Sequence, residues 1–592
     1  MTADHPIPGS TPSAVDEVDP ITLTVVWSGL RDVCDDIGYA LRRTAHSEIV
    51  RDAGDCAAAV FDARGRNVAQ GVFSPGMLGP MTFIVGHMLE RFPAEELSPG
   101  DSLITNDIYI GAGHLPDAFT VTPVFVEDDL IGFVGSSVHL MDVGGAVVGS
   151  LSVDGIIDNY QEGLRIPPIR HYENGEPVEN VTRMIANNVR FPEKVLGDIR
   201  AMIAANNFGA RRLSEFFARY GPRVLNRCFD RLLDDSEART RAAIAALPDG
   251  VYSREEMLDD YGPGTPPVKL AVDLRIGGSD VEIDWSRADP QVPAGMNSAH
   301  GYSLAYSAFT FKALVSPDVP MNEGCMRPIA FTAPEGSFLN PRPPAPGGGR
   351  AVTVHRHFET IAGAMADALP DGSLGACSQF CNTMAAGTDE DGRPYMLWDM
   401  LMGGFPARST KDGAEGLCSV LNGRNIPVEV SETWAPVLVE RLEFVRDTGG
   451  PGEHRGACAV RKDIRFLGSE NRVTPITDRH HFPPHGVHGG GAGACGQIVV
   501  NPAAEATPAH SKAEVEVAKG DVVSFQVSGA GGYGPALRRS PARVAEDVLE
   551  GYVSRAAALC EYGVAVDHEG GVDDVATRRH RANRETKGDE RK

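Results

Sequence analysis

Apolar residues that recur every three or four positions predict most of the helices in the first 250 residues. Asp19 and Pro20 are typical of a helix start, and the apolar stripe from Val26 to Leu41 indicates one buried helix face. Further helices are expected over 77–91, 181–220 and 223–246. Short apolar runs between them are typical of strands, over 55–61, 67–70 and 102–105. This part of the chain is therefore expected to be a sheet flanked by helices.

A longer pair of apolar runs, 118–126 and 130–140, predicts a β-hairpin that turns at Glu127-Asp128-Asp129. Folding the hairpin about its central turn residue places Asp117 opposite His139, each 11 residues away. Opposed residues of an antiparallel pair have Cβ atoms about 5 Å apart, and a bulge shifts the register without separating them. A histidine and an aspartate are therefore expected to meet at the open end of the hairpin.

Candidate metal ligands follow from this hairpin. His114 and Asp142 each lie 14 residues from the central turn residue, so the same folding places them opposite each other. The motif His114-x-x-Asp117 and His139 are therefore expected to gather at the open end of the hairpin. Two histidines and one carboxylate suit Zn, Mn or non-haem Fe, with positions left open for water or substrate. The alternative is a set of hydrogen-bonding loop residues at a strand end. Asp55 heads another apolar strand, where turn capping is favoured over ligation, since an unpaired buried carboxylate is costly.

From residue 250 to about 535 the pattern changes to short strands separated by Gly/Pro turns. Helices are expected at 303–314 and 358–369, and Pro341–Gly349 has the composition of a linker or surface loop. The expected regions are a disordered lead-in (1–18), an α+β metal-site region (19–249), a strand-rich region (250–535), a C-terminal helix (536–567) and a disordered charged tail (568–592). The predicted fold class is α+β, with a helix-flanked N-terminal sheet followed by a strand-rich, Gly/Pro-turn-rich C-terminal half.

Composition and charge narrow the class of protein. Of the 592 residues, 42% are hydrophobic and 23% charged, as in an ordinary soluble globular protein of about three or four domains. A net charge of −25 disfavours a surface for nucleic acid or anionic membrane. No apolar run approaches the roughly 18 residues of a membrane span, and Met1–Val18 lacks the apolar core of a secretion signal. The ten cysteines are scattered without a CxxC pair, so a reduced, cytoplasmic protein is the simplest expectation.

Other motifs are weaker candidates for function. Gly491–Gly496 has the spacing of a dinucleotide fingerprint but precedes an expected strand instead of a helix. Gly387–Gly392 has Walker spacing but continues with Arg393-Pro394, where a P-loop needs Lys and Ser/Thr. His355 and His357 would share one face of a strand, with no carboxylate beside them. A Gly/Pro loop carries four more histidines: His480, His481, His485 and His488. Neither histidine group is favoured over the hairpin as a metal site.

Several short motifs are specific enough to suggest a relationship to known proteins. They are Leu41-Arg42-Arg43-Thr44-Ala45, Asn106-Asp107-x-Tyr109, His114-Leu115-Pro116-Asp117, His139-x-x-Asp142-Val143-Gly144-Gly145, Tyr160–Pro168, Asn322-Glu323-Gly324-Cys325-x-Arg327-Pro328, Gly449-Gly450-Pro451-Gly452-x-x-Arg455-Gly456 and Gly529-x-Gly531-Gly532-Tyr533-Gly534. With them, roughly Asp19 to Asp567 resembles the hydantoinase B/oxoprolinase family. That family includes the B-type components of ATP-dependent N-methylhydantoinases and lactamases, the matching part of 5-oxoprolinase, and large subunits of acetone- and acetophenone-type carboxylases.

The resemblance implies a catalytic divalent metal, with Zn or Mn more expected than Fe. The implied ligands are Asp55, His114, Asp117 and His139. The sequence departs from the usual family pattern beside these positions, at Ile108, Ala112 and Leu140. The ligands are retained while the wall around them differs, so the substrate is where this chain is expected to differ from its relatives.

Further roles are implied by the same resemblance. Asp142 or Asp107 would orient a ligand imidazole or serve as a base, because a metal-bound histidine usually donates its other nitrogen to such a group. Glu162 and Arg165, in a loop that bears opposite charges three residues apart, are candidates for substrate contact.

A partner is also implied, because the family uses ATP bound by a hydantoinase A-type subunit and this chain has no nucleotide motif of its own. That subunit would phosphorylate a substrate oxygen, in a hetero-oligomer with two or more copies of this chain. The expected function is the metal-dependent subunit of an ATP-dependent cyclic-amide hydrolase acting on a hydantoin, lactam or 5-oxoproline-like ring. The alternatives are the large subunit of a ketone carboxylase, a type that tends to be longer, and a non-catalytic scaffold subunit.

Overall fold

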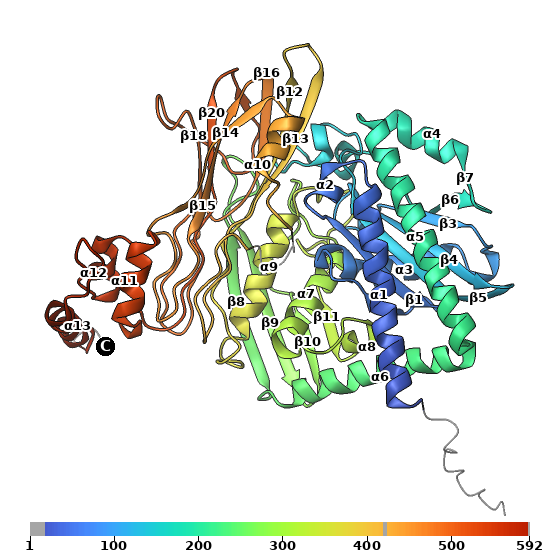
Figure 1. Ribbon diagram of the computed structural model, residues 1–592, viewed down its shortest axis with the longest axis horizontal. Helices are drawn as coiled ribbons and strands as arrows, with labels where there is room; N and C mark the ends of the chain where they lie inside the picture. Colours follow the sequence, from blue (N-terminus) through green and yellow to red (C-terminus); the bar gives the residue numbers. More distant parts are fainter. Residues whose placement is uncertain (1–17, 418–422, 590–592) are drawn as a thin grey trace, which may run out of the picture.

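The computed structural model describes residues 18–417 and 423–589, which form helices and four β-sheets (Figure 1). The predicted α+β class is confirmed. Within these residues no helix is both long and apolar enough to cross a membrane. No disulfide joins two cysteines of the described residues. The lead-in expected over 1–18 lies outside the described residues except for Val18.

Helices of the first half begin within two residues of the predicted starts, except for α2, which the sequence does not predict. The Asp19 side chain accepts hydrogen bonds from the amides of Ile21 and Thr22 and so caps the first helix. The six helices are α1 (Pro20–Thr44), α2 (Glu48–Arg51), α3 (Pro75–Arg91), α4 (Glu179–Asn188), α5 (Pro192–Tyr220) and α6 (Pro222–Ala245).

The first sheet is antiparallel throughout and holds the predicted hairpin at its centre. Its strands, in spatial order, are β2 (Asn67–Gln70), β1 (Cys56–Asp62), β5 (Asp129–His139), β4 (Asp117–Val126), β3 (Ser102–Thr105), β6 (Ile169–Glu173) and β7 (Glu176–Pro177). The hydrophobic pattern does not predict β6 and the edge strand β7, because both are partly exposed and charged residues interrupt their apolar positions.

Helices cover both faces of this sheet, so its central strands are buried on both sides. Two neighbouring residues of β5 show the division. Val134 lies beside Gly209 of α5, whereas Gly135 lies beside Met81 of α3. Because successive strand residues point to opposite faces, α5 and α3 cover opposite sides of the sheet. The open end of the hairpin is thereby held between two packed layers.

The second sheet connects the two halves of the chain. Its order is β11 (Ile329–Thr332), β10 (Asp280–Asp284), β9 (Val268–Gly277) and β8 (Gly250–Leu258). The associated helices are α7 (His300–Val315), α8 (Glu323–Met326) and α9 (Ala351–Ala364). α9 packs on β8 and β9, and α7 packs on both α9 and α3. The second sheet is thus joined through α7 to the helices of the first.

One predicted element differs in type. His355 and His357, expected on a strand, lie in α9, which begins seven residues before the predicted start at Phe358. The alternation of Val352 and Val354 with polar residues imitates a strand. In the fold the helix is buried on nearly every side, so its polar residues face inward as well and the usual helical periodicity is lost.

The last two sheets pack face to face as a sandwich. One has the order β13 (Pro394–Leu401), β12 (Cys381–Thr388), β16 (Ser469–Ile476) and β19 (Val515–Val517). The other has the order β14 (Val437–Val445), β15 (Ala459–Phe466), β20 (Val522–Gln526), β17 (Gln497–Val500) and β18 (Thr507–Ala509), with α10 (Val428–Trp434) beside β14. Apolar residues such as Leu397 and Ile464 fill the space between them. The alternate residues of β13, including Trp398, face the core shared with the second sheet.

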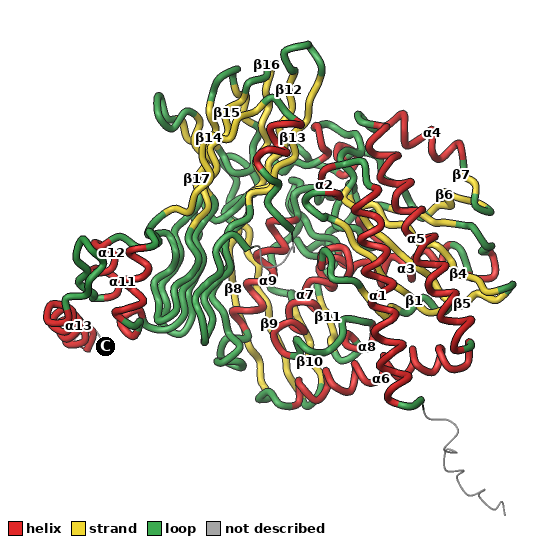
Figure 2. The backbone as a smooth tube through the Cα atoms, viewed as in Figure 1, coloured by secondary structure: helices red, strands yellow, loops and turns green. Residues whose placement is uncertain are grey.

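Below the sandwich lies a stack of extended loops that Figure 2 shows running side by side. We call it the glycine layer, and it comprises 374–380, 403–414, 449–457, 484–496 and 528–534. Backbone hydrogen bonds join these segments, and their glycines let the backbones touch directly: a Cβ on Gly493 would lie 2.6 Å from the carbonyl carbon of Gly529. The spacing of Gly491–Gly496 is therefore explained by backbone packing, and β17 follows it as predicted.

The C-terminal residues form three helices, α11 (Pro541–Leu549), α12 (Arg555–Tyr562) and α13 (Asp574–Asp589). The single helix expected over 536–567 is two helices, and the tail expected to be disordered from 568 contains α13. Its composition is charged, but tertiary hydrogen bonds hold it: Thr577 Oγ1 accepts from the Ala565 amide, and Arg581 donates to the carbonyls of Tyr562 and Arg539. These partners lie outside the segment, which is why its own pattern does not predict the helix.

Replacing Gly531 with alanine is expected to lower the free energy of unfolding by about 3 kcal/mol, since overpacking against a fixed backbone is costly. An added Cβ would lie 1.9 Å from the carbonyl oxygen of His485 within the glycine layer. Gly277→Ala is the matched control, because a Cβ there meets nothing within 4 Å. Thermal unfolding followed by circular dichroism measures both, and equal melting temperatures for the two variants would refute the tight packing described.

Candidate metal centre

The predicted hairpin is formed, and its open end carries the candidate ligands. β4 and β5 pair with Asp117 opposite His139, and the register stays regular until a bulge next to Phe125, near the turn. His114 lies just before β4, in a turn closed by a 3.0 Å hydrogen bond from the Asp117 amide to the His114 carbonyl. The second predicted pair, His114 opposite Asp142, is not formed, because the ladder ends at Asp117 and His139.

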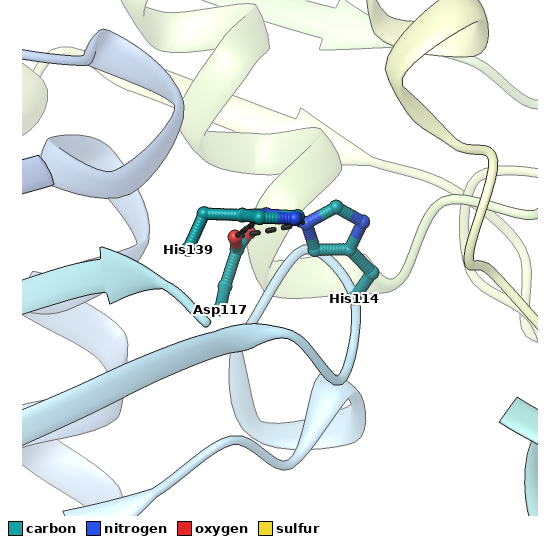
Figure 3. Close-up of side chains that lie close together, drawn as sticks. All are labelled: His114, Asp117 and His139. Carbon is teal, nitrogen blue, oxygen red and sulfur yellow. Dashed lines mark hydrogen bonds and ion pairs between the residues drawn. The ribbon is translucent and has the colours of Figure 1, made fainter. Parts of the chain in front are cut away.

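Three ligand-type atoms converge at this end (Figure 3). The Nε2 atom of His114 lies 2.8 Å from Asp117 Oδ1 and 2.9 Å from His139 Nδ1, and 3.2 Å separates the last two atoms. In the described part of the chain these are the three His, Cys, Asp or Glu side chains whose ligand atoms gather within 4.8 Å. Each residue is at most 4% exposed. The predicted convergence of these three side chains is therefore confirmed, and their role as metal ligands stays a prediction.

A buried arginine that the sequence pattern does not reveal completes this cluster. Arg350 Nη2 donates to Asp117 Oδ2 at 2.8 Å, and its guanidinium lies 4.5 Å from the centre of the Tyr302 ring. Arg350 immediately precedes α9 and Tyr302 belongs to α7, so the second half of the chain contributes directly to the hairpin end. The one local signal is a lone arginine between a glycine run and an apolar helix start.

The loop that leads to Arg350 is mostly internal. Pro341–Gly349, whose composition predicts a linker or surface loop, is exposed only at residues 342–344, and residues 345–349 are buried. Composition misleads here because the glycines allow close approach of backbones: a Cβ on Gly347 would lie 2.7 Å from the Asn297 carbonyl oxygen.

Glu162 holds this loop from behind. Its carboxylate accepts hydrogen bonds from the amides of Gly347 and Gly348 and, at 2.7 Å, from Asn159 Nδ2. The Gly348 carbonyl in turn lies 3.0 Å from His114 Nδ1. The predicted substrate contact is thus a buried support for the loop that supplies a hydrogen-bond partner of His114.

Charge and burial set the protonation of the cluster. Burial, together with the neighbouring Arg350, lowers the pKa of His114 to about 4, so its imidazole is neutral near pH 7. Burial alone would raise the pKa of Asp117, but His114 and Arg350 hold it well below its usual range. A neutral imidazole beside an ionised carboxylate is the protonation state that metal binding requires.

The donor set fits a divalent cation. Two groups contact His114 Nδ1: the Gly348 carbonyl oxygen at 3.0 Å and Arg350 Nη1 at 3.2 Å. The carbonyl contact is the shorter, and a carbonyl oxygen can only accept a hydrogen bond. This contact assigns the ring proton to Nδ1 and leaves the Nε2 lone pair facing Asp117 and His139, as a ligating histidine usually does. Metal–ligand bonds of about 2.0–2.1 Å place neighbouring ligand atoms roughly 3 Å apart, which matches the spacing observed.

A small cavity of about 40 Å³ lies beside these atoms, with room for an ion and its water. Asp55 lines it, and burial raises the pKa of that carboxyl, which also forms a hydrogen bond with Ser74. Asp55 does not belong to the group of atoms within 4.8 Å. The opposite wall comes from the third sheet, through Asn382, Trp398 and Met400.

Comparison with known proteins identifies the family of the chain. The hydantoinase B/oxoprolinase family model matches residues 19–536. The chain belongs to this family. A putative D-/L-hydantoinase of Pseudomonas sp. (strain NS671) has a B component that is 31% identical over 94% of this chain and 97% of its own length. The beta chain of the caprolactamase of Pseudomonas jessenii is 30% identical over 95% of this chain and 99% of its own.

Solved structures show the same architecture. The ATP-dependent caprolactamase of Pseudomonas jessenii superposes with a TM-score of 0.87 at 27% identity, covering 95% of this chain and 100% of that one. A nucleotide-free acetone carboxylase superposes with a TM-score of 0.86 at 18% identity, covering 96% of this chain and 83% of that one. The second likeness shows a shared fold alone.

Two aspartates predicted as catalytic in this family member lie away from the cavity. Asp142 is fully buried and accepts hydrogen bonds from the amides of Gly144 and Gly149 and from Arg190, at 2.9, 3.1 and 2.8 Å. Since its carboxylate is satisfied by its own loop and by Arg190, Asp142 organises that loop and does not reach the His114 imidazole.

Asp107 and the predicted substrate contact Arg165 lie on a neighbouring loop. Asp107 caps the short 3₁₀ helix Ile108–Ile110 through the amide of Tyr109, 3.0 Å away, and its carboxylate lies 3.8 Å from Arg165 Nε. The Arg165 guanidinium lies 5.5 Å from the centre of the Tyr109 ring. These two charges therefore bind each other, and neither lines the cavity.

The other histidine groups have structural partners. His357 Nε2 lies 2.7 Å from Ser307 Oγ, and burial lowers the pKa of His357 to about 3. In the second group, His485 pairs with Glu256 at 2.8 Å and His488 Nε2 contacts Ser373 at 2.9 Å. Within the described residues, neither group brings three ligand atoms together as the hairpin does.

Glu162 should make stability depend on pH. Burial raises the pKa of Glu162 to about 7, from an ordinary value of about 4.5, in spite of its three hydrogen bonds. Its contribution to the free energy of unfolding is therefore complete below pH 4.5 and is lost as the pH rises through 7, a decrease of about 2 kcal/mol between pH 5 and 8. Glu162→Gln should remove this dependence. Melting temperatures of both proteins at pH 5 and 8 test it, and parallel pH profiles would count against the assignment.

Proposed function

We propose that this chain is the metal-dependent catalytic subunit of an ATP-dependent cyclic-amide hydrolase. The substrate class is a hydantoin, lactam or 5-oxoproline-like ring. The observation that carries the proposal is the convergence of His114, Asp117 and His139 within a chain that matches a caprolactamase beta chain over 95% of its length. The putative hydantoinase component supports the same class of substrate.

His114, Asp117 and His139 would hold a divalent metal, Zn or Mn, and Asp55 would join them as a fourth ligand. Asp55 heads β1 beside β5, lines the same cavity and interacts electrostatically with His139 and Asp117. Two imidazoles and carboxylates with an open position suit these ions. When bound, the metal supplies Lewis-acid polarisation of a substrate oxygen and a nucleophilic water near neutral pH.

The chain's own residues prepare this site. Arg350 keeps Asp117 ionised and oriented through a charge-assisted hydrogen bond of 2.8 Å. The Gly348 carbonyl accepts the Nδ1 proton of His114 and so directs Nε2 inward. The flexible side chains of Met77 and Met400 line the cavity, and their displacement gives a ring substrate the room that 40 Å³ does not.

The same comparisons support an ATP-using partner. The names of both relatives mark them as single components of multi-subunit enzymes, and the caprolactamase is described as ATP-dependent. We assign ATP to a hydantoinase A-type subunit in a hetero-oligomer that contains two or more copies of this chain. Phosphorylation of the amide oxygen by that subunit would convert a poor electrophile into one that water attacks at this site.

The second candidate is the large subunit of an ATP-dependent ketone carboxylase. The acetone carboxylase superposes as closely as the caprolactamase, which favours a shared scaffold. Coverage distinguishes the two, because this chain spans 100% of the caprolactamase chain but 83% of the carboxylase chain. The hydrolase is therefore preferred. A purely structural subunit would not require the buried cluster of His114, Asp117 and His139.

Removing either histidine of the cluster should remove the metal. We expect His114→Ala and His139→Ala to lower the metal content of the purified complex from about one ion per chain to near zero and to abolish turnover, while the partner still binds. His357→Ala is the control, because that buried histidine lies in α9 away from the cluster. Elemental analysis after size-exclusion chromatography gives the answer. Full metal content in both variants would rule out these ligands.

The reaction class can be decided on the assembled complex. With ATP and Zn or Mn, ring opening of hydantoin, ε-caprolactam or 5-oxoproline is expected, with one ATP consumed per ring, and no incorporation of labelled bicarbonate. Chromatography of the opened products and scintillation counting measure both. Stable label in acetone or acetophenone products would instead establish the carboxylase.

A further inference from the structure

We propose that Asn382 and Trp398, from the β12–β13 hairpin, bind the amide edge of the substrate ring as an acceptor and a donor. This inference rests on the proposed function and names residues that recognise the ring. It assigns substrate recognition to the C-terminal half of the chain, opposite the hairpin that carries the candidate ligands.

The strand register puts the two side chains on one face. Asn382 lies opposite Met400, and Met384 lies opposite Trp398, so Asn382 and Trp398 are diagonal neighbours. Diagonal neighbours are about 7–8 Å apart at the backbone, a distance that an indole spans. The intervening residue Asp399 points to the other face, where Lys462 binds it at 2.8 Å.

This face looks onto the candidate metal centre. Both residues line the cavity shared with His114, Asp117 and His139. The Trp398 ring lies 6.0 Å from the His139 ring, centre to centre. A ring held between the two walls would contact the metal position on one side and β12–β13 on the other.

Both side chains carry an unsatisfied polar atom. Asn382 is 5% and Trp398 1% exposed, yet Asn382 Oδ1 and Trp398 Nε1 have no hydrogen-bond partner within the described structure. A buried polar group without a partner costs about 1–3 kcal/mol. A ligand that supplies both partners would recover this energy, so the fold maintains a donor and an acceptor for something that enters the cavity.

A buried asparagine and a buried tryptophan elsewhere in the structure have hydrogen-bond partners, unlike Asn382 Oδ1 and Trp398 Nε1. Asn471, on the adjacent strand β16, uses its side chain fully: Oδ1 accepts from Tyr395 at 2.7 Å and Nδ2 donates to the carbonyls of Gly468 and Val517. The indole of Trp285 donates to Ser307 Oγ at 3.2 Å. The buried amide oxygens of Asn67 and Asn206 also lack a partner among the described residues, so what distinguishes Asn382 and Trp398 is that both line the cavity that faces the ligands.

The chemistry of a cyclic amide matches this pair. The ring forces its amide into the cis form, so the N–H and the C=O point from the same edge. Asn382 Oδ1 would accept from the N–H, which a ring phosphorylated on oxygen keeps in its protonated imidate form, and the Trp398 indole N–H would donate to the oxygen. The aliphatic remainder of the ring would pack on Met77 and Met400. An amide alkylated on nitrogen lacks the donor and would leave Asn382 unpaired.

The test compares paired substrates on the metal-loaded complex. For whichever ring of the panel is opened, kcat/KM is measured for the N–H form and its N-methyl form. Wild-type protein should prefer the N–H form, and Asn382→Leu should reduce that preference about tenfold by slowing the N–H form alone. Trp398→Phe, which keeps the aromatic ring, should raise KM about tenfold for both forms. Metal content should not change in either variant.

Asn471→Leu is the matched control, since it removes a buried amide from the same sheet away from the cavity; it should lower the melting temperature and leave the preference intact. A wild-type preference that Asn382→Leu does not change, or no preference at all in the wild type, overturns the proposal.

A binding measurement separates this proposal from the function on which it rests. Calorimetric titration of the zinc-loaded complex with ε-caprolactam and N-methylcaprolactam needs no turnover. Tighter binding of ε-caprolactam that is lost in Asn382→Leu supports the pair even where no ATP-dependent hydrolysis is found. Hydrolysis with equal binding of both rings, or no binding of either, refutes the pair.

Discussion

Antiparallel pairing of β4 with β5 is the constraint on which the site depends. It sets Asp117 opposite His139, and a slip of one residue would turn one of them to the other face of the sheet, among α5 and its neighbours. The bulge lies near the turn, so it adjusts the loop and leaves the ligand end in register. Helices on both faces bury the hairpin and prevent it from sliding.

Burying charges at this end requires compensation from elsewhere in the chain. Asp117 and Arg350 pair across 233 residues of sequence, and a lone member of such a pair would be costly. Arg350 can reach the hairpin only because α9 is fixed in place. Further along that helix, Arg356 binds Asp478, which also binds Lys512 at 2.8 Å. The position of the guanidinium at the site therefore depends on buried ion pairs well outside it.

The site is also a product of two halves with different packing rules. The first half packs helices on a sheet through side chains, whereas the glycine layer packs backbone on backbone and supports the sandwich above it. The sandwich presents Asn382 and Trp398 to the ligands. The cavity between these layers has one wall with charged candidate ligands and one wall with neutral polar groups. One wall can therefore activate a substrate while the other recognises it.

Local physics was enough for the sequence to determine α1 with its Asp19 cap, the central hairpin and the meeting of His114, Asp117 and His139. Capping, periodicity and strand alternation act over a few residues, and a two-arm hairpin has one natural register. Tertiary structure alone decided the rest. It paired Asp142 with Arg190 and buried the glycine run before Arg350. It also brought Asn382 and Trp398 to the cavity. These placements depend on contacts between segments that lie tens to hundreds of residues apart, which leave no periodic trace in the chain.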